Sequence, residues 1–317
     1  MSALSVSSVP APTRWIIGRG LLGSAIERSR PDAAFSVAVD WSSTEATLSS
    51  LSAGLDEFLA LAGDGDWEIY WSAGRGVTST PREVMMREAE VFEQFLALAD
   101  ERLPRDGRGS FFLGSSVGGA YAGNEHPPFT ETTPTAPLSA YGEAKLRMEA
   151  ALTAAIARSG RRAFIARVTN LYGPGQDMAK GQGLISAIVG GYVTGRPISV
   201  YVSLDTLRDY IFVDDCGRVI AAAMDRVRSQ PAGTVVTKIV GSMRALSIGA
   251  LLGEIARLRR RPVALVLGQG DARGQSLDLR VRSTVWTDLD ALASTTLPEG
   301  LGVVYQAQLR AHMISGR

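Results

Sequence analysis

Short apolar runs alternate with helical repeats along the first half of the chain, and this alternation predicts the fold. The apolar runs cover residues 15–17, 35–39, 69–71, 111–113 and 163–168. Between them, apolar residues recur at helical spacing, at Met85, Ala89 and Phe92 and again from Met148 onward. The alternation predicts an α/β fold, in which a doubly wound parallel sheet of the Rossmann type carries helices on both faces.

After about residue 170 the pattern loosens, and residues 172–175 are typical of a turn. Residues 211–213 and 219–224 predict one further strand and helix, and residues 248–258 predict a later helix. We therefore expect a disordered extension at 1–13 and a dinucleotide-binding domain at 14–170 plus about 209–240. A smaller C-terminal α/β lobe, which would bind the substrate, is expected at about 171–208 plus 241–317.

Composition then excludes several classes of protein. The 317 residues are 45% hydrophobic and 21% charged with a net charge of +1, so nucleic acid and membrane are not expected partners. One cysteine, Cys216, excludes a disulfide framework, and two histidines argue against a metal centre. No apolar run reaches the roughly 20 residues of a membrane span, and the N-terminus does not resemble a signal peptide. We expect a cytoplasmic protein. We also expect Cys216 to be a small side chain packed in the buried core.

A glycine turn follows the first apolar run and opens a helix. Its residues are Gly18, Arg19, Gly20, Leu21, Leu22 and Gly23. Such a turn lets the backbone approach a pyrophosphate at a helix N-terminus. Asp40 closes the next apolar run, where a carboxylate can bind both adenosine ribose hydroxyls and favour NAD. Arg19 could instead pair with the 2′-phosphate of NADP. A glycine turn without a ligand, beside a solvated Asp40, is the alternative. Ala73 and Gly74, after the run at 69–71, are further candidates for cofactor binding.

Tyr141 and Lys145 lie four residues apart in a helical pattern, so they share one face. A nearby ammonium and an oxidised nicotinamide both favour the phenolate, which could take a proton from a substrate hydroxyl as hydride leaves for the cofactor. Lys145 would also hold the nicotinamide ribose. Ser116 ends the run at 111–113, at the carboxyl end of a parallel strand, and can bond the reacting oxygen. Alone, each residue is more simply a surface or capping group; together they predict a catalytic site.

The combination resembles the extended short-chain dehydrogenase/reductase family, which includes nucleotide-sugar epimerases, dehydratases and reductases. The resemblance covers about residues 14–275 and includes the motifs at 167–174 and 208–215. It implies that Asn170 binds the diphosphate or sugar and that Arg208 pairs with the diphosphate, with Arg273 as a second diphosphate arginine. Simpler interpretations remain: Asn170 as a turn residue, Arg208 with Asp209 as a surface ion pair, and Asp215 as a helix N-cap.

The chain departs from the family pattern at three places. Ile17 replaces the first glycine of the turn, Glu88 replaces an asparagine in a helix, and residues 202–205 replace a glycine-rich hairpin near the nucleotide base. The last departure leaves the base open. Relatives commonly form dimers through helices that correspond to about 84–102 and 141–158, so a homodimer is expected.

The residues around Ser116 bear on the reaction. Val117 and Gly118 follow it where sugar 4,6-dehydratases carry an Asp-Glu pair, which argues against dehydration. Cys216 is badly placed for the Cys and His of an epimerase-reductase. Asp40 then favours an NAD-dependent 4-epimerase of a nucleotide-diphosphate sugar. An NADPH-dependent 4-ketoreductase, a small-carbonyl reductase and a non-catalytic cofactor sensor stay open.

Overall fold

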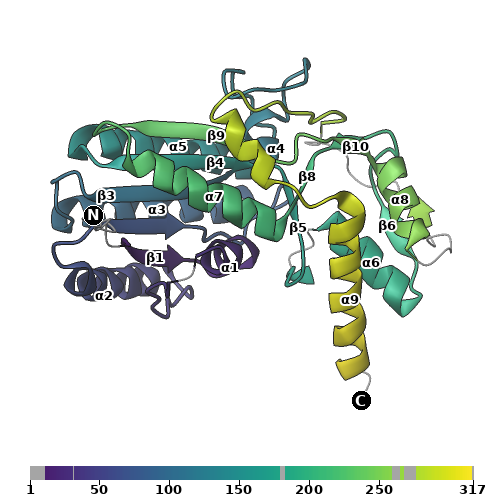
Figure 1. Cartoon of the computed structure of the whole chain (residues 1–317), viewed down its shortest axis with the longest axis horizontal. Coiled ribbons are helices and arrows are strands. Elements are labelled where there is room, and N and C mark those ends of the chain that lie inside the picture. The colour runs from purple at the N-terminus through teal and green to yellow at the C-terminus, as the bar shows by residue number, and fades with distance from the viewer. Residues whose placement is uncertain (1–10, 31, 179–182, 259–264, 268–275, 316–317) are drawn as a thin grey trace, which may run out of the picture.

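The computed structural model describes residues 11–30, 32–178, 183–258, 265–267 and 276–315. A central sheet of five parallel strands runs in the order β1-β2-β3-β4-β9 (Figure 1). Its strands are β1 (Thr13–Ile17), β2 (Trp67–Trp71), β3 (Gly109–Ser116), β4 (Arg162–Val168) and β9 (Val235–Val240). The parallel sheet confirms the predicted α/β fold.

The two faces of this sheet follow from alternation along the strands, because successive side chains point to opposite sides. Odd-numbered residues such as Trp15, Ile69 and Phe111 pack with helices on one face, and even-numbered residues such as Tyr70 and Phe112 pack on the other. The first face carries α2 (Thr44–Ala62), α3 (Arg82–Arg102) and α5 (Ala140–Ser159). The second carries α1 (Leu21–Arg28) and α7 (Val213–Arg228). Both faces are therefore covered, as a doubly wound sheet requires.

The strand expected at residues 35–39 does not form. Only Phe35 bridges Trp15, in parallel, with its N–H on the Arg14 carbonyl at 2.7 Å. The partner bond, from Ile16 N to Phe35 O, is long at 3.4 Å. The ladder stops there, while Val37 and Val39 still pack on the first core face. The apolar run was therefore a correct sign of burial and a wrong sign of strand pairing.

The C-terminal part of the chain builds three small sheets beside the central one (Figure 1). The pairs are β5 (Asn170–Tyr172) with β8 (Tyr210–Phe212), β7 (Leu207–Arg208) with β10 (Leu246–Ser247), and β6 (Ile198–Val200) with β11 (Leu265–Leu267). A third core cluster joins them to α6 (Leu184–Thr194), α8 (Ile248–Arg257) and α9 (Leu297–Ser315). The short helix η2 (Thr287–Leu292) instead returns to pack on the α7 face of the main sheet.

Helix α7 corrects one further expectation. It begins at Val213, so Asp215 lies inside its first turn and is not the N-cap. The buried Asp215 carboxylate accepts hydrogen bonds from Thr295 N at 2.8 Å and Thr295 Oγ1 at 2.7 Å, and it pairs with Arg218. It therefore anchors the segment that precedes α9. Cys216, beside it, is fully buried, and burial raises the pKa of its thiol.

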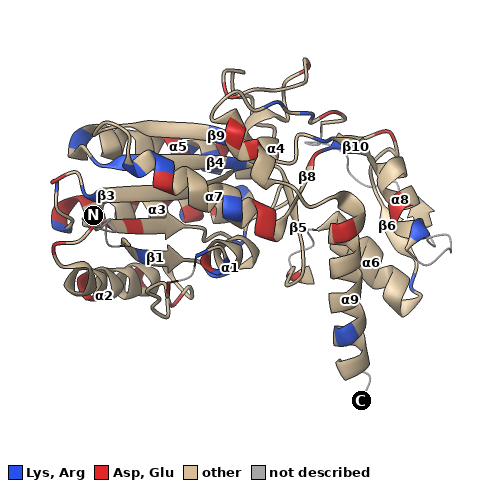
Figure 2. Ribbon diagram, in the orientation of Figure 1, with Lys and Arg blue, Asp and Glu red and all other residues tan. Residues whose placement is uncertain are grey.

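Charged residues of both signs are interspersed over these elements (Figure 2). Helix α9 is an exception, since its long exposed stretch carries few charges (Figure 2). Within the described ranges, no helix is long and apolar enough to cross a membrane.

Candidate active site

The glycine turn follows β1 at the carboxyl end of the sheet, where the chain changes direction: Phe35 bridges one side of β1, and β2 pairs with the other side. Open α/β sheets bind ligands at such a switch point. Gly18 has a φ of +88°, and a Cβ on it would overlap Ala73, which follows β2. Ser72 holds the turn by donating its hydroxyl to Gly18 O at 2.7 Å and Ile17 O at 3.1 Å. The turn is therefore fixed from both neighbouring strands.

The start of α1 is open where a ligand would approach. Gly20 is its N-cap, and no side chain caps it among the described residues. A Cβ on Gly20 would meet nothing within 4 Å, whereas a Cβ on Gly23 would overlap Gly18 O. Leu22 faces inward, with Cδ2 3.2 Å from where a Cβ on Gly114 would lie. Uncapped N–H groups and open space beside a glycine fit the diphosphate of a dinucleotide.

Asp40 and Arg19 are both exposed, but they differ in their partners. Asp40 lies at the end of the segment beside β1, and its Oδ1 accepts the Ser42 N–H at 2.9 Å. The hydrogen bonds from Ser42 lower the pKa of Asp40. Arg19 pairs with Glu27 of α1 through both guanidinium nitrogens. Asp40 is thus free to accept from ribose hydroxyls, while the charge of Arg19 is already matched.

Ser116, Tyr141 and Lys145 meet at the carboxyl end of β3. Ser116 caps α4 (Val117–Tyr121) by accepting the Gly119 N–H at 3.1 Å. A Cβ on Gly119 would lie 3.3 Å from Ser116 Cβ and 3.4 Å from Tyr141 Cε1, so that glycine separates the two side chains. Lys145 Nζ lies 5.9 Å from the Tyr141 ring centre and donates to Gly114 O at 3.2 Å. The Tyr141 hydroxyl has no hydrogen-bond partner within the described part of the chain.

Gly142 explains how α4 and α5 come this close. A Cβ there would overlap Gly119 O and lie 2.9 Å from Pro137 Cβ. Ser139, the N-cap of α5, accepts the Gly142 N–H at 3.2 Å and fixes where the helix begins. Tyr141 is consequently held in the first turn of α5, opposite Ser116.

A network of buried polar side chains lies one helix turn from Lys145, and it was not predicted from the sequence. Glu149, one turn after Lys145, accepts hydrogen bonds from Ser115 Oγ at 2.5 Å and Arg167 Nη2 at 2.6 Å. Arg167 Nη1 also donates to Tyr121 Oη at 2.5 Å. Burial alone lowers the pKa of Arg167, but bonding to Glu149 outweighs it and the pKa is raised. Burial raises the pKa of Tyr121. The spacing of Lys145 and Glu149 could have signalled this shared helix face.

Arg208 lies in β7 and is 9% exposed. Among the described residues, its guanidinium donates one hydrogen bond, to the carbonyl of the preceding Leu207 at 2.9 Å, and forms no ion pair. Burial lowers the pKa of Arg208, and the electrostatic effects of Tyr210 and Asp278 offset this only in part. The simpler interpretation of Arg208 with Asp209 as a surface ion pair is wrong, because the Asp209 carboxylate instead accepts from Ser242 and from Arg244 N.

Asn170 begins β5 and is exposed, and its Nδ2 donates to the Asp209 carbonyl at 2.8 Å. This bond links β5 to the residue just before β8 and leaves the amide oxygen available. Arg273 lies outside the described residues. Within those residues, no group of three or more His, Cys, Asp and Glu side chains could hold a metal ion.

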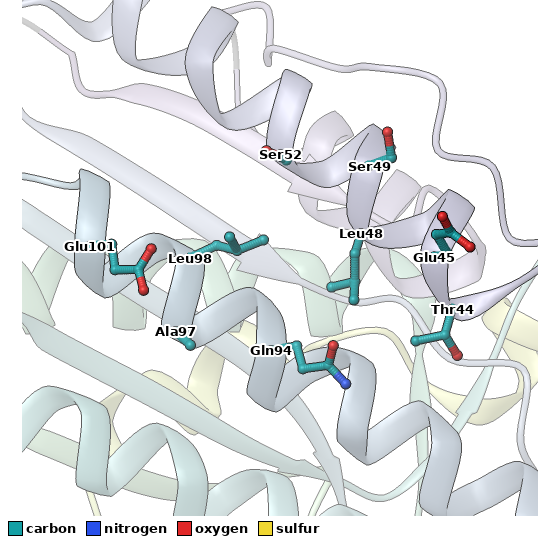
Figure 3. A pocket seen from close by; sticks show the side chains of 9 residues that line it. All are labelled: Thr44, Glu45, Leu48, Ser49, Ser52, Gln94, Ala97, Leu98 and Glu101. Carbon is teal, nitrogen blue, oxygen red and sulfur yellow. The ribbon is translucent and has the colours of Figure 1, made fainter.

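A groove of about 760 Å³ lies elsewhere, between α2 and α3 (Figure 3). Leu48 and Leu98 approach each other across it, and polar side chains such as Gln94 and Glu101 line it (Figure 3). It includes none of the candidate catalytic or cofactor residues. The candidate active site therefore lies away from this groove, at the carboxyl edge of the sheet.

Comparison with known proteins identifies the family. The model of the NAD dependent epimerase/dehydratase family matches residues 16–237. The chain therefore belongs to the NAD dependent epimerase/dehydratase family, and its cofactor is NAD.

Individual relatives match over shorter stretches. The chain is 27% identical over 111 residues to dTDP-4-dehydro-6-deoxyglucose reductase of Escherichia coli, covering 35% of each protein. It is 34% identical over 100 residues to dTDP-glucose 4,6-dehydratase of Mycobacterium tuberculosis, covering 32% of this chain and 29% of that one. These matches span about a third of the relatives' length.

The fold also matches a solved structure over nearly its whole length. UDP-glucuronic acid 4-epimerase of Bacillus cereus, in complex with UDP-glucuronic acid and NAD, superposes with a TM-score of 0.74. The alignment covers 95% of this chain and all of that one at 17% identity, and it shows the shared fold.

Proposed function

We propose that this protein is an NAD-dependent 4-epimerase of a nucleoside-diphosphate sugar. The observation that carries the proposal is the meeting of Ser116, Tyr141 and Lys145 beside the glycine turn, where the Tyr141 hydroxyl bonds to none of the described residues. Bound NAD supplies a hydride acceptor and donor for the sugar carbon. The diphosphate turn would be Gly18 to Gly23, with Asp40 on the adenosine ribose and Ala73 and Gly74 beside the cofactor.

The chain's own residues would move and hold the proton. Tyr141 takes the proton of the sugar hydroxyl as hydride leaves the same carbon, and returns it after the keto-sugar has turned over. Ser116 bonds the reacting oxygen, and Lys145 favours the phenolate by its charge while it binds the nicotinamide ribose. The hydride that leaves the carbon carries both electrons of the oxidation, and the proton of the hydroxyl oxygen goes to Tyr141. Both return to the sugar in the second half of the reaction, so the sugar undergoes no net oxidation.

Arg208 supports the substrate class. Its buried guanidinium has no ion pair among the described residues, so a bound anion would stabilise its charge. A guanidinium also matches two phosphate oxygens in a fork. Asn170, with its amide oxygen open, would bond the diphosphate or sugar, and Arg273 would be a second diphosphate arginine. A small-carbonyl reductase would have no use for such an arginine.

Two neighbouring reactions are distinguished by particular residues. A dehydratase is disfavoured because Val117 and Gly118 bring no acid or base next to Ser116. A 4-ketoreductase uses the same three catalytic residues with exchangeable NADPH. The open Asp40 and the matched charge of Arg19 favour NAD, and hence the epimerase.

The test is to load the protein with NAD, supply UDP-, GDP- and dTDP-hexoses, and follow C4 configuration by proton NMR. We expect interconversion of 4-epimers without net NADH formation. Reduction of a 4-keto-sugar with consumption of NADPH, and no epimer, would overturn the proposal in favour of the reductase.

We also propose that the protein forms a homodimer through the helices at about 84–102 and 141–158. Light scattering on the purified protein would give twice the chain mass. A monomer at working concentration would remove the dimer and leave the reaction untouched.

A further inference from the structure

Glu88 is an acidic side chain at the candidate site for which the proposed reaction has no role. It lies in the second turn of α3, and its Oε1 accepts the backbone N–H groups of Arg75 at 2.8 Å and Gly76 at 3.0 Å. These residues follow Gly74 at the carboxyl end of β2. Glu88 therefore pins the loop that forms one side of the cofactor turn.

The second oxygen of Glu88 faces the catalytic lysine. A Cβ placed on Gly74 would lie 3.4 Å from Glu88 Oε2 and 3.6 Å from Lys145 Nζ. The carboxylate and the ammonium thus both border the same small space. Gly74 has a φ of +152° and no side chain to fill that space.

Nearby glutamates pair with arginines, whereas Glu88 has no such partner among the described residues. On α5, Glu149 is neutralised by Arg167 of β4, which also bonds Tyr121 of α4, and Glu143 pairs with Arg82. Glu88 forms no ion pair among the described residues, and its hydrogen-bond partners there are neutral N–H groups. A fixed negative charge therefore remains beside Lys145.

We propose that the Glu88 carboxylate makes the site bind oxidised NAD in preference to NADH. This inference rests on the proposed role of Lys145 at the nicotinamide ribose. The oxidised nicotinamide ring carries one positive charge more than the reduced ring. A fixed carboxylate nearby lowers the energy of the charged ring and leaves the neutral ring almost unaffected. The site would thereby favour the cofactor state that begins an oxidation at the sugar.

The test compares binding of NAD+ and NADH by calorimetry to the wild type and to Glu88→Gln. The amide keeps an oxygen for the Arg75 and Gly76 N–H groups and removes only the charge. We expect NAD+ affinity to fall about tenfold and NADH affinity to change less than about twofold. Glu90→Gln is the matched control, because Glu90 is exposed on the same helix, and it should change neither affinity.

Each other outcome counts against the inference. Equal weakening of both forms in Glu88→Gln would show that Glu88 only holds the loop. No change in either affinity would show that its charge does not reach the ring. A wild type that binds neither form would overturn the cofactor assignment as well. Glu88→Ala, which removes the loop acceptor too, should weaken both forms and provides a reference for loop disorder. Because no sugar is used, an error in the proposed sugar reaction would not change these results.

Discussion

The cofactor side and the substrate side of the candidate site are built in different ways. On the cofactor side, Gly18, Gly23 and Gly142 stand where a single added carbon would overlap backbone or a neighbouring residue. On the substrate side, Arg208 is a long side chain with one local hydrogen bond in the described part of the chain. Substitutions on the cofactor side should therefore change both folding stability and ligand binding. Substitution of Arg208 should change substrate binding and leave the fold intact.

The largest effect should come from overfilling the cofactor turn. In Gly23→Ala the new Cβ would overlap Gly18 O, so we expect loss of roughly 3 kcal/mol of unfolding free energy and no measurable NAD binding. Gly20→Ala is the matched variant, because its Cβ meets only open space. It should leave the unfolding free energy within about 0.5 kcal/mol and still weaken NAD, since the methyl would occupy the diphosphate's place. Chemical denaturation and calorimetry measure both; equal stability of the two variants would contradict this packing.

Arg208→Met should separate substrate binding from fold. Removal of a buried cation that pairs with a diphosphate costs about 2 kcal/mol or more, so KM for the nucleotide sugar should rise at least about 30-fold. NAD affinity and thermal stability should change little. Arg257→Met, on the exposed surface of α8, is the control. An unchanged KM in Arg208→Met would mean that the arginine does not face the substrate.

Asp40 provides a smaller effect within the cofactor side. Asp40→Ala should lower NAD affinity and reduce the ratio of NAD to NADP affinity about tenfold. The adenosine ribose loses its hydrogen-bond acceptor, and the 2′-phosphate of NADP no longer meets a repelling charge. Competition binding with the two dinucleotides measures the ratio. If the ratio stays the same, the carboxylate does not contact the ribose.

The α2–α3 groove should show the smallest effect. Gln94→Ala changes a side chain that lines this groove, away from the candidate catalytic residues. NAD affinity and turnover should stay within about twofold of wild type. A marked loss of turnover would mean that the groove, and not only the sheet edge, contributes to the reaction.

The sequence predicted the parts that follow from periodicity. Alternating apolar residues revealed the buried strands, and the spacing of Tyr141 and Lys145 revealed their shared helix face. Periodicity reports burial but not pairing, so residues 35–39 were predicted as a strand although only Phe35 bridges Trp15.

Contacts between distant segments were beyond reach. The bond of Glu88 to Arg75 and Gly76 and the pair of Glu149 with Arg167 depend on how helices dock on the sheet. Asp215 looked like an N-cap because an acid before a helical run is typical of one. Its true partner, Thr295, lies 80 positions along the chain.

The central claim is that Tyr141 carries the proton in a hydride-transfer reaction. Tyr141→Phe removes one hydroxyl and keeps the ring that packs beside Gly119. The most direct test is to measure, on that variant and the wild type, both the NAD dissociation constant and the rate of sugar 4-epimerisation. The account predicts nearly unchanged NAD binding and a rate at least about 1,000-fold lower. A variant that binds NAD and epimerises the sugar at the wild-type rate would contradict it.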